Sequence, residues 1–197
     1  MDRKALDASS SSQNDNLVFG RIERARERGV SGSGFTVAAE DDSSFFVPAS
    51  LGQQLQLYPG QELDKNEYDV IKRRTELLQV RVKALDLLAM RDHSAAELRL
   101  KLLQREFSEQ YIDTVLTSLK GAGLLDDRRF AESWIRMRLR KNPCGRALLA
   151  SGLAMKGVDR ETAHRAIDAQ LDEETLRQAL EAAADKLLRR KGMTREK

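Results

Sequence analysis

The sequence predicts a mainly α-helical protein of tandem three-helix repeats, with a small β-rich element near its N-terminus. Apolar residues recur with helical spacing from about residue 64 onward, whereas residues 17–63 contain short β-branched and aromatic runs broken by glycine. With an offset of 51 residues, the apolar positions of one helical block fall on those of the next. The composition agrees, because 5% aromatic residues and three prolines in 197 residues are typical of a helical body.

The N-terminal part predicts two segments of different character. Residues 1–16 are rich in Ser, Asp and Asn without periodicity, so a disordered tail is expected. Residues 17–63 predict a small antiparallel β element with a turn near Asp41–Ser44. Pro48 argues against a central strand position because proline cannot donate to the ladder.

Residues 64–123 predict a linking helix followed by the first three-helix repeat. Asp64 and Glu67 have the spacing of a capping box, and the helix that they open is expected to reach about Met90. Ser94 with Glu97 forms a full S-x-x-E capping box for the next helix.

The remaining helical segments predict a second repeat and a single further helix. The second repeat is expected over 126–171, and the offset of 51 places Leu98 on Leu149 and Leu102 on Leu153. Residues 173–191 predict a lone C-terminal helix, which resembles the start of an incomplete third repeat.

The most basic stretch of the chain lies at the start of the second repeat. Asp126 and Asp127 are predicted to cap a helix and to suit the positive end of its dipole. From Arg128 to Lys156 there are eight basic residues against one acid, Glu132, although the whole chain carries only +3. Positive charge is therefore concentrated here, which favours contact with a polyanion or an acidic partner.

The predicted helix after Asp127 divides into two faces. Phe130, Trp134 and Met137 share an apolar stripe with Ala131 and Ile135 at its edge, and the helical angle places Arg138 on that same side. We expect Arg138 to pair with a carboxylate such as Asp127. A second face carries arginines, and it serves either as a solvated surface or as a binding surface: Arg129, Arg136 and Arg140.

No motif indicates catalysis, a cofactor or a metal. The single cysteine, Cys144, excludes an internal disulfide framework, and His93 and His164 have no ligand spacing with it. Capping explains the adjacent carboxylates Asp126 and Asp127, so the chain is not expected to be an enzyme. An apolar signal region and a run of transmembrane length are both lacking, which predicts a cytoplasmic protein.

Three runs of sequence resemble the RecX family of bacterial RecA regulators. They are Leu124–Lys141, with its acidic pair before Arg-Phe-Ala, Arg91–Leu103, with R-D-H-S-x-x-E-L, and Gly152–Val158. The resemblance covers roughly Ala84 to Arg190, and it implies tandem three-helix repeats that bind along a RecA filament. Where the family commonly has a glutamate, this chain has Gly152, so either that helix bends or another group approaches its backbone closely.

The resemblance implies a regulator of recombination, DNA repair and the SOS response that inhibits RecA ATPase and strand exchange. Its expected partners are the RecA filament and single- or double-stranded DNA, with no membrane contact and a monomeric state. A general basic nucleic-acid binder and a helical protein-interaction scaffold are the open alternatives. The predicted RecA/DNA-binding residues are Lys101, Arg105, Arg129, Arg136, Arg140 and Arg146, and the predicted structural caps are Ser94, Asp126 and Asp127.

Overall fold

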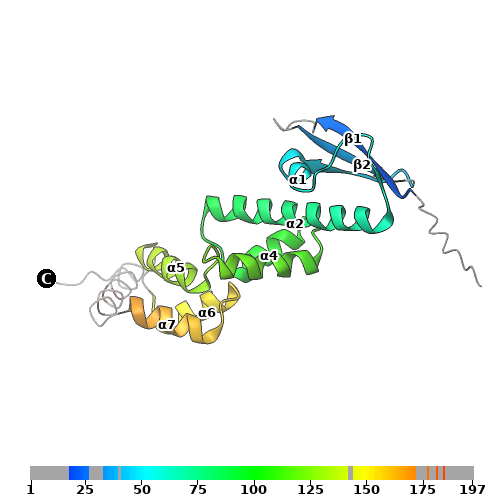
Figure 1. The fold of residues 1–197 in the computed structure, drawn as a ribbon. Helices are drawn as coiled ribbons and strands as arrows, with labels where there is room; N and C mark the ends of the chain where they lie inside the picture. Colours follow the sequence, from blue (N-terminus) through cyan, green and yellow to red (C-terminus); the bar gives the residue numbers. More distant parts are fainter. Residues whose placement is uncertain are drawn as a thin grey trace, which may run out of the picture. The chain divides into compact units, whose positions relative to one another are not determined.

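The computed structural model describes residues 18–26, 33–39, 41–141 and 144–171, together with Arg177, Glu181 and Ala184. It divides into two compact units, Met1–Glu76 and Leu77–Lys197, and each is described by itself (Figure 1). The predicted tail over 1–16 lies outside the described residues. So does nearly all of the predicted helix 173–191, of which only the three single residues named above are described. In the described part, no helix is both long enough and apolar enough to cross a membrane.

The first unit contains a four-stranded antiparallel sheet with the strand order β3-β2-β1-β4. Its inner face carries Ile22 opposite Val37, and both side chains are fully buried. Pro48 ends an edge strand, where its missing N–H costs no ladder hydrogen bond. The strands are β1 (Gly20–Arg26), β2 (Ser33–Ala39), β3 (Ser44–Pro48) and β4 (Glu62–Leu63).

Two local features complete this sheet. The turn between β2 and β3 lies where the sequence predicted it, and there the carboxylate of Asp41 accepts hydrogen bonds from the backbone N–H and the hydroxyl of Ser43. A short helix that the sequence did not predict, α1 (Ala49–Gln54), packs against β2. The ring of Phe35 lies so close to Gly52 of this helix that a Cβ there would be 2.3 Å from it.

Helix α2 (Lys65–Met90) begins at the predicted capping box. The carboxylate of Asp64 accepts the N–H of Glu67 at 2.8 Å, and the carboxylate of Glu67 accepts the N–H of Asp64 at 3.1 Å. The two side chains therefore satisfy two backbone donors reciprocally, which sets the start of the helix.

The second unit contains two three-helix repeats, as the sequence predicted (Figure 1). The 51-residue offset holds for the helix bounds, because Met90, Ala95 and Glu109 map onto residues 141, 146 and 160, where helices of the second repeat end or begin. The first repeat is the last part of α2 with α3 (Ala95–Leu103) and α4 (Glu109–Gly121), and the second is α5 (Asp127–Lys141), α6 (Arg146–Met155) and α7 (Arg160–Gln170).

The helices of each repeat pack around an apolar core of their own. Leu98 and Leu102 of the first core are fully buried, and so are their equivalents Leu149 and Leu153 in the second. Truncating a leucine in such a position typically costs about 2–5 kcal/mol, so these equivalent pairs fix the helices of each repeat.

Gly152 is required by the packing of the second repeat. The ring of Trp134 on α5 lies over its backbone, and a Cβ at Gly152 would be 2.4 Å from Cη2 of that ring. The sequence had left open a bend or a close approach at this position, and the structure shows the close approach.

We expect Gly152→Glu to lower the free energy of unfolding by about 1–3 kcal/mol through overpacking, although glycine is a poor helix former. Trp134 is the single tryptophan, so its emission should shift to longer wavelength as the ring is displaced. The matched control is Gly121→Glu, because a Cβ at Gly121 meets nothing within 4 Å. Equal stability of the two variants in denaturant unfolding would contradict this assignment.

Candidate functional site

The strongest candidate surface is the C-terminal half of α5, where exposed cations gather. We call Arg136, Arg138, Arg140 and Lys141 the α5 basic end. All four are exposed, and none forms an ion pair among the described residues. Cations in the last turn also stabilise the helix dipole, by about 0.3–1 kcal/mol each, so part of their role is structural.

The structure corrects the predicted faces of α5. Phe130, Ala131 and Ile135 form its buried side, whereas Met137 is 50% exposed. Arg138 is exposed instead of lying in an apolar stripe, so it needs no buried carboxylate. The true core face is rotated toward Ala131 and Ile135, and this rotation brings Arg138 into the α5 basic end.

Arg129 is held within the connection between the repeats. Its guanidinium donates hydrogen bonds to the carbonyl oxygens of Gly123 and Leu124, at 3.2 and 3.0 Å. Its Nε also lies 3.6 Å from a carboxylate oxygen of Asp92. These contacts fix the turn before α5, so Arg129 is less available to a partner than the α5 basic end.

The other three predicted cations lie apart from each other or are already engaged. Arg146 forms an ion pair of 2.5 Å with Asp168, and Arg105 donates to the carbonyl oxygen of Lys101 at 2.8 Å. Lys101 is in the last turn of α3, whereas Arg129 meets Asp92 ahead of that helix. Lys101 is the seventh residue of α3, so roughly 9 Å of helix separates it from the start of that helix.

The predicted caps at the start of α5 act on two different helices. The carboxylate of Asp126 accepts the N–H groups of Arg128 and Arg129, at 2.8 and 3.2 Å, so Asp126 caps α5. Asp127 instead accepts the N–H of Ala95 at 2.7 Å and pairs with Lys120 at 3.1 Å. The acid that was expected to support its own helix therefore caps α3 of the first repeat.

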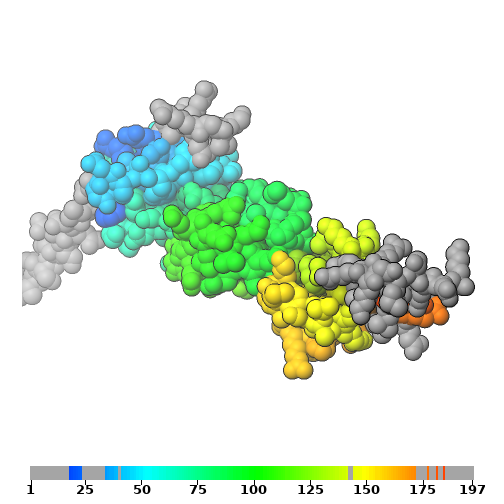
Figure 2. Space-filling model, turned by 180° about the vertical axis from the view of Figure 1, so that it is seen from behind, coloured from blue at the N-terminus to red at the C-terminus, as the bar shows by residue number. Residues whose placement is uncertain are grey.

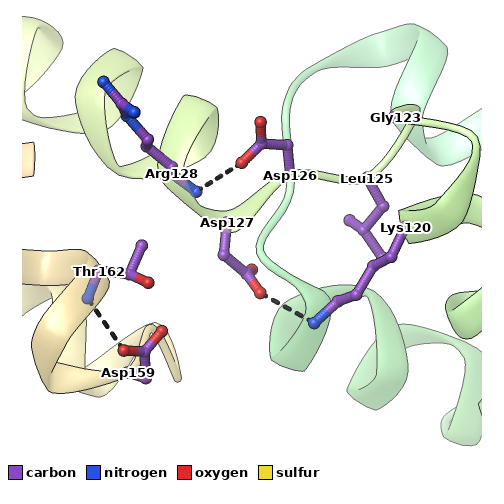
Figure 3. A pocket seen from close by; sticks show the side chains of 8 residues that line it. All are labelled: Lys120, Gly123, Leu125, Asp126, Asp127, Arg128, Asp159 and Thr162. Carbon is purple, nitrogen blue, oxygen red and sulfur yellow. Dashed lines mark hydrogen bonds and ion pairs between the residues drawn. The ribbon is translucent and has the colours of Figure 1, made fainter.

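A cavity of about 410 Å³ opens beside these caps, and Figure 3 shows its lining. Asp126, Asp127 and Asp159 all line it. Each already accepts a backbone N–H, because Asp159 caps α7 through Thr162 at 2.9 Å. Carboxylates engaged in this way are helix caps, and their geometry gives no support to acid–base chemistry.

We expect Asp126→Ala to cost about 1 kcal/mol of stability, as the loss of a helix cap typically does. Partner binding measured at a temperature where the variant stays folded should be nearly unchanged. A large loss of affinity without a change in thermal unfolding would assign this carboxylate to binding instead.

Ser94 joins the two repeats as well as capping α3. Its hydroxyl oxygen accepts the N–H of Glu97 at 3.1 Å and donates to the carbonyl oxygen of Lys156 at 2.5 Å. In a full capping box the carboxylate of Glu97 would also accept the backbone N–H of Ser94, and here it does not. Its carboxylate instead bonds Lys156 at 2.7 Å and Arg91 at 3.1 Å.

We call Ser94, Glu97, Asp127, Lys156 and Gly157 the repeat junction. The green first repeat and the yellow second repeat lie against each other in the space-filling view (Figure 2), and the hydrogen bonds from Ser94 to Lys156 and from Ala95 to Asp127 join them. Sequence reasoning missed the part played by Lys156 and Gly157. The signal was present in the Gly152–Val158 run, which carries a cation and a glycine together.

The pKa values of Glu97 in the repeat junction and of the neighbouring His93 are both lowered. Burial lowers the pKa of His93 below its ordinary 6.5, and the charges of Arg91 and Lys101 lower it further. Burial acts to raise the pKa of Glu97, but hydrogen bonds from Lys156 and Arg91 outweigh it and lower that pKa. His93 is therefore neutral and Glu97 ionised at neutral pH.

Stability should fall as the pH drops below 6.5, because the unfolded chain then binds a proton at His93 that the folded chain does not. The contribution of Glu97 is lost at lower pH, below its ordinary 4.5. We expect His93→Gln to flatten the loss of unfolding free energy between pH 6.5 and pH 4.5. A slope equal to the parent's would contradict this role for His93.

Comparison with known proteins assigns both repeats to one family. Residues 81–119 match the model described as RecX, first three-helix domain, and residues 126–167 match RecX, second three-helix domain. A protein named regulatory protein RecX from Treponema pallidum is 41% identical over 96 residues, 47% of this chain and 58% of that protein. One of the same name from Prosthecochloris aestuarii is 37% identical over 105 residues, 53% of this chain and 68% of that protein.

A solved structure supports the fold. The crystal structure of a regulatory protein RecX matches with a TM-score of 0.69 and 22% identity, covering 90% of this chain and 86% of that one. By sequence, the chain spans about half to two thirds of the length of the curated relatives that it matches. The order of the two domain matches along the chain follows the two helical repeats that the structure contains. This chain belongs to the RecX family.

Proposed function

We propose that this chain binds the RecA–DNA filament and inhibits RecA ATP hydrolysis, strand exchange and recombination. The observation that carries the proposal is the α5 basic end, which presents exposed cations without described ion-pair partners in a RecX-family repeat. Guanidinium groups suit this task because each can bind a phosphate or a carboxylate with two donors.

The predicted contact residues divide into three groups under this proposal. Arg136 and Arg140 make the primary contacts, together with Arg138, which the sequence had placed on the apolar side. Lys101, Arg105 and Arg146 contribute from outside α5, and Arg129 acts mainly by holding the turn before α5. The primary contacts therefore come from a single helix, and its position depends on the repeat junction.

The compartment and the oligomeric state of the protein are part of the same proposal. We propose a cytoplasmic monomer, acting in DNA repair and the SOS response through RecA. In that setting its partner is an assembled filament, so binding should require RecA and DNA together.

DNA-dependent ATP hydrolysis by RecA tests the proposal directly. Adding the protein to preformed filaments should lower the hydrolysis rate in a saturable manner. Heat-denatured protein at equal concentration controls for non-specific effects. Hydrolysis unchanged at concentrations that saturate the filament would contradict inhibition, and faster hydrolysis would assign the opposite direction of regulation.

A further inference from the structure

A second cavity, of about 320 Å³, lies between α6 and α7 of the second repeat. Its apolar lining comes from both helices and the turn between them. Its polar lining comes from Ser151 on α6 and from Arg160 and His164, one turn apart on α7, and all three are exposed. The apolar lining residues are Ala150, Ala154, Val158 and Ala163.

The equivalent place in the first repeat is filled by an ionic clamp. The offset of 51 residues maps Ala150 onto Arg99. The guanidinium of Arg99 bonds a carboxylate oxygen of Glu109 at 3.2 Å and one of Asp113 at 3.1 Å. A cation on α3 thus joins two carboxylates on α4 and holds the two helices together.

The second repeat lacks the arginine of this clamp and has an arginine and a histidine in place of its two carboxylates. Ala150 replaces the arginine, Arg160 stands at the position of Glu109, and His164 stands at the position of Asp113. In the described part of the chain, neither Arg160 nor His164 forms an ion pair with a carboxylate. The nearby acid Asp159 caps α7 through Thr162 and lines the other cavity. The guanidinium of Arg160 beside this apolar lining therefore favours an anion.

We propose that this cavity binds an aspartate or glutamate side chain from an acidic, apolar-flanked segment of a partner protein. The carboxylate would pair with the guanidinium of Arg160 and accept a hydrogen bond from the imidazole of His164, and the apolar neighbours in the segment would cover the alanine-rich lining. A free phosphate fits less well, because it has no apolar neighbours to cover the alanine-rich lining. The site lies on α6 and α7, so it is distinct from the α5 basic end.

Titration of the chain with short peptides tests this site. The probe is the tripeptide N-acetyl-Leu-Glu-Leu-amide, and the readout is the NMR shift of the Ala154 and Ala163 methyl groups. We expect saturable shifts, with affinity about tenfold weaker for the glutamine analogue of the peptide, which cannot form the ionic bonds. Equal affinity for the two peptides, or no saturable shift, would overturn the proposal.

Two variants and one control complete the test. The triple variant Ala150→Arg, Arg160→Glu, His164→Asp rebuilds the clamp of the first repeat, so it should fold and lose peptide binding. The double variant Arg160→Ala, His164→Ala should also lose binding if the triple variant fails to fold. Arg165→Ala, at an exposed arginine outside the cavity lining, should bind as the parent does. Tighter binding of inorganic phosphate or a thymidine oligonucleotide would assign the cavity to nucleic acid and overturn the proposal.

Discussion

Gly157→Ala is expected to lower the free energy of unfolding by about 2–5 kcal/mol. The backbone at Gly157 has φ of +71°, where an L-residue costs about 1–2 kcal/mol. A Cβ there would also lie 2.2 Å from Cβ of Ala96 in the first repeat, and overpacking of this kind typically costs about 1–3 kcal/mol more. Gly157 directly follows Lys156, which bonds Ser94 and Glu97 of the first repeat. A shift of the backbone at Gly157 should therefore separate the two repeats at the repeat junction.

The matched control is Gly123→Ala. Gly123 has nearly the same backbone conformation, with φ of +67°, but a Cβ there meets nothing within 4 Å. Gly123→Ala should lower the free energy of unfolding only by the cost of the left-handed backbone conformation, about 1–2 kcal/mol. Chemical denaturation of both variants measures the difference, and equal losses would show that contact with Ala96 does not stabilise the junction.

Reversing Arg136, Arg138 and Arg140 to Glu is expected to weaken filament binding by about a hundredfold, since each charge-assisted hydrogen bond that is removed is worth roughly 1 kcal/mol. If these residues meet duplex phosphates, the slope of log K against log salt should flatten by about 0.9 for each phosphate that is no longer neutralised. The variant should also lose about 1–3 kcal/mol of stability, because cations near a helix C-terminus favour the dipole. Binding must therefore be measured well below its unfolding temperature.

A second charge reversal controls for the change in net charge. Lys72, Arg73 and Arg74 on α2 are exposed, so changing all three to Glu gives the same net charge as the α5 variant. This control should keep most of the parent's affinity for the filament. Equal weakening by both variants would mean that net charge, and not the α5 basic end, governs binding.

Local rules made much of this structure predictable from the sequence. The Asp64 and Glu67 box opens α2, Ser94 begins α3, and the turn at Asp41 joins two strands. The 51-residue offset predicted the equivalent buried leucines, because each repeat must build the same apolar core. These features depend on residues a few positions apart or on a repeated pattern, so sequence alone reveals them.

The repeat junction was not predictable in the same way. Ser94 meets Lys156 across 62 positions, and Asp127 reaches back 32 positions to Ala95. Nothing in the local pattern distinguishes an acid that caps its own helix from one that caps another. The orientation of α5 was missed for a similar reason, since packing against α7 selects which side of an ambiguous stripe is buried.

We expect the α5 basic end to bind a RecA–DNA filament in preference to DNA alone. Fluorescence anisotropy of the labelled protein, titrated with preformed filaments and with the same DNA alone, tests it most directly. We predict saturable binding to filaments that is at least about tenfold tighter than binding to bare DNA at the same salt concentration. Equal affinity for bare DNA and for filaments would contradict the claim and identify a general nucleic-acid-binding protein.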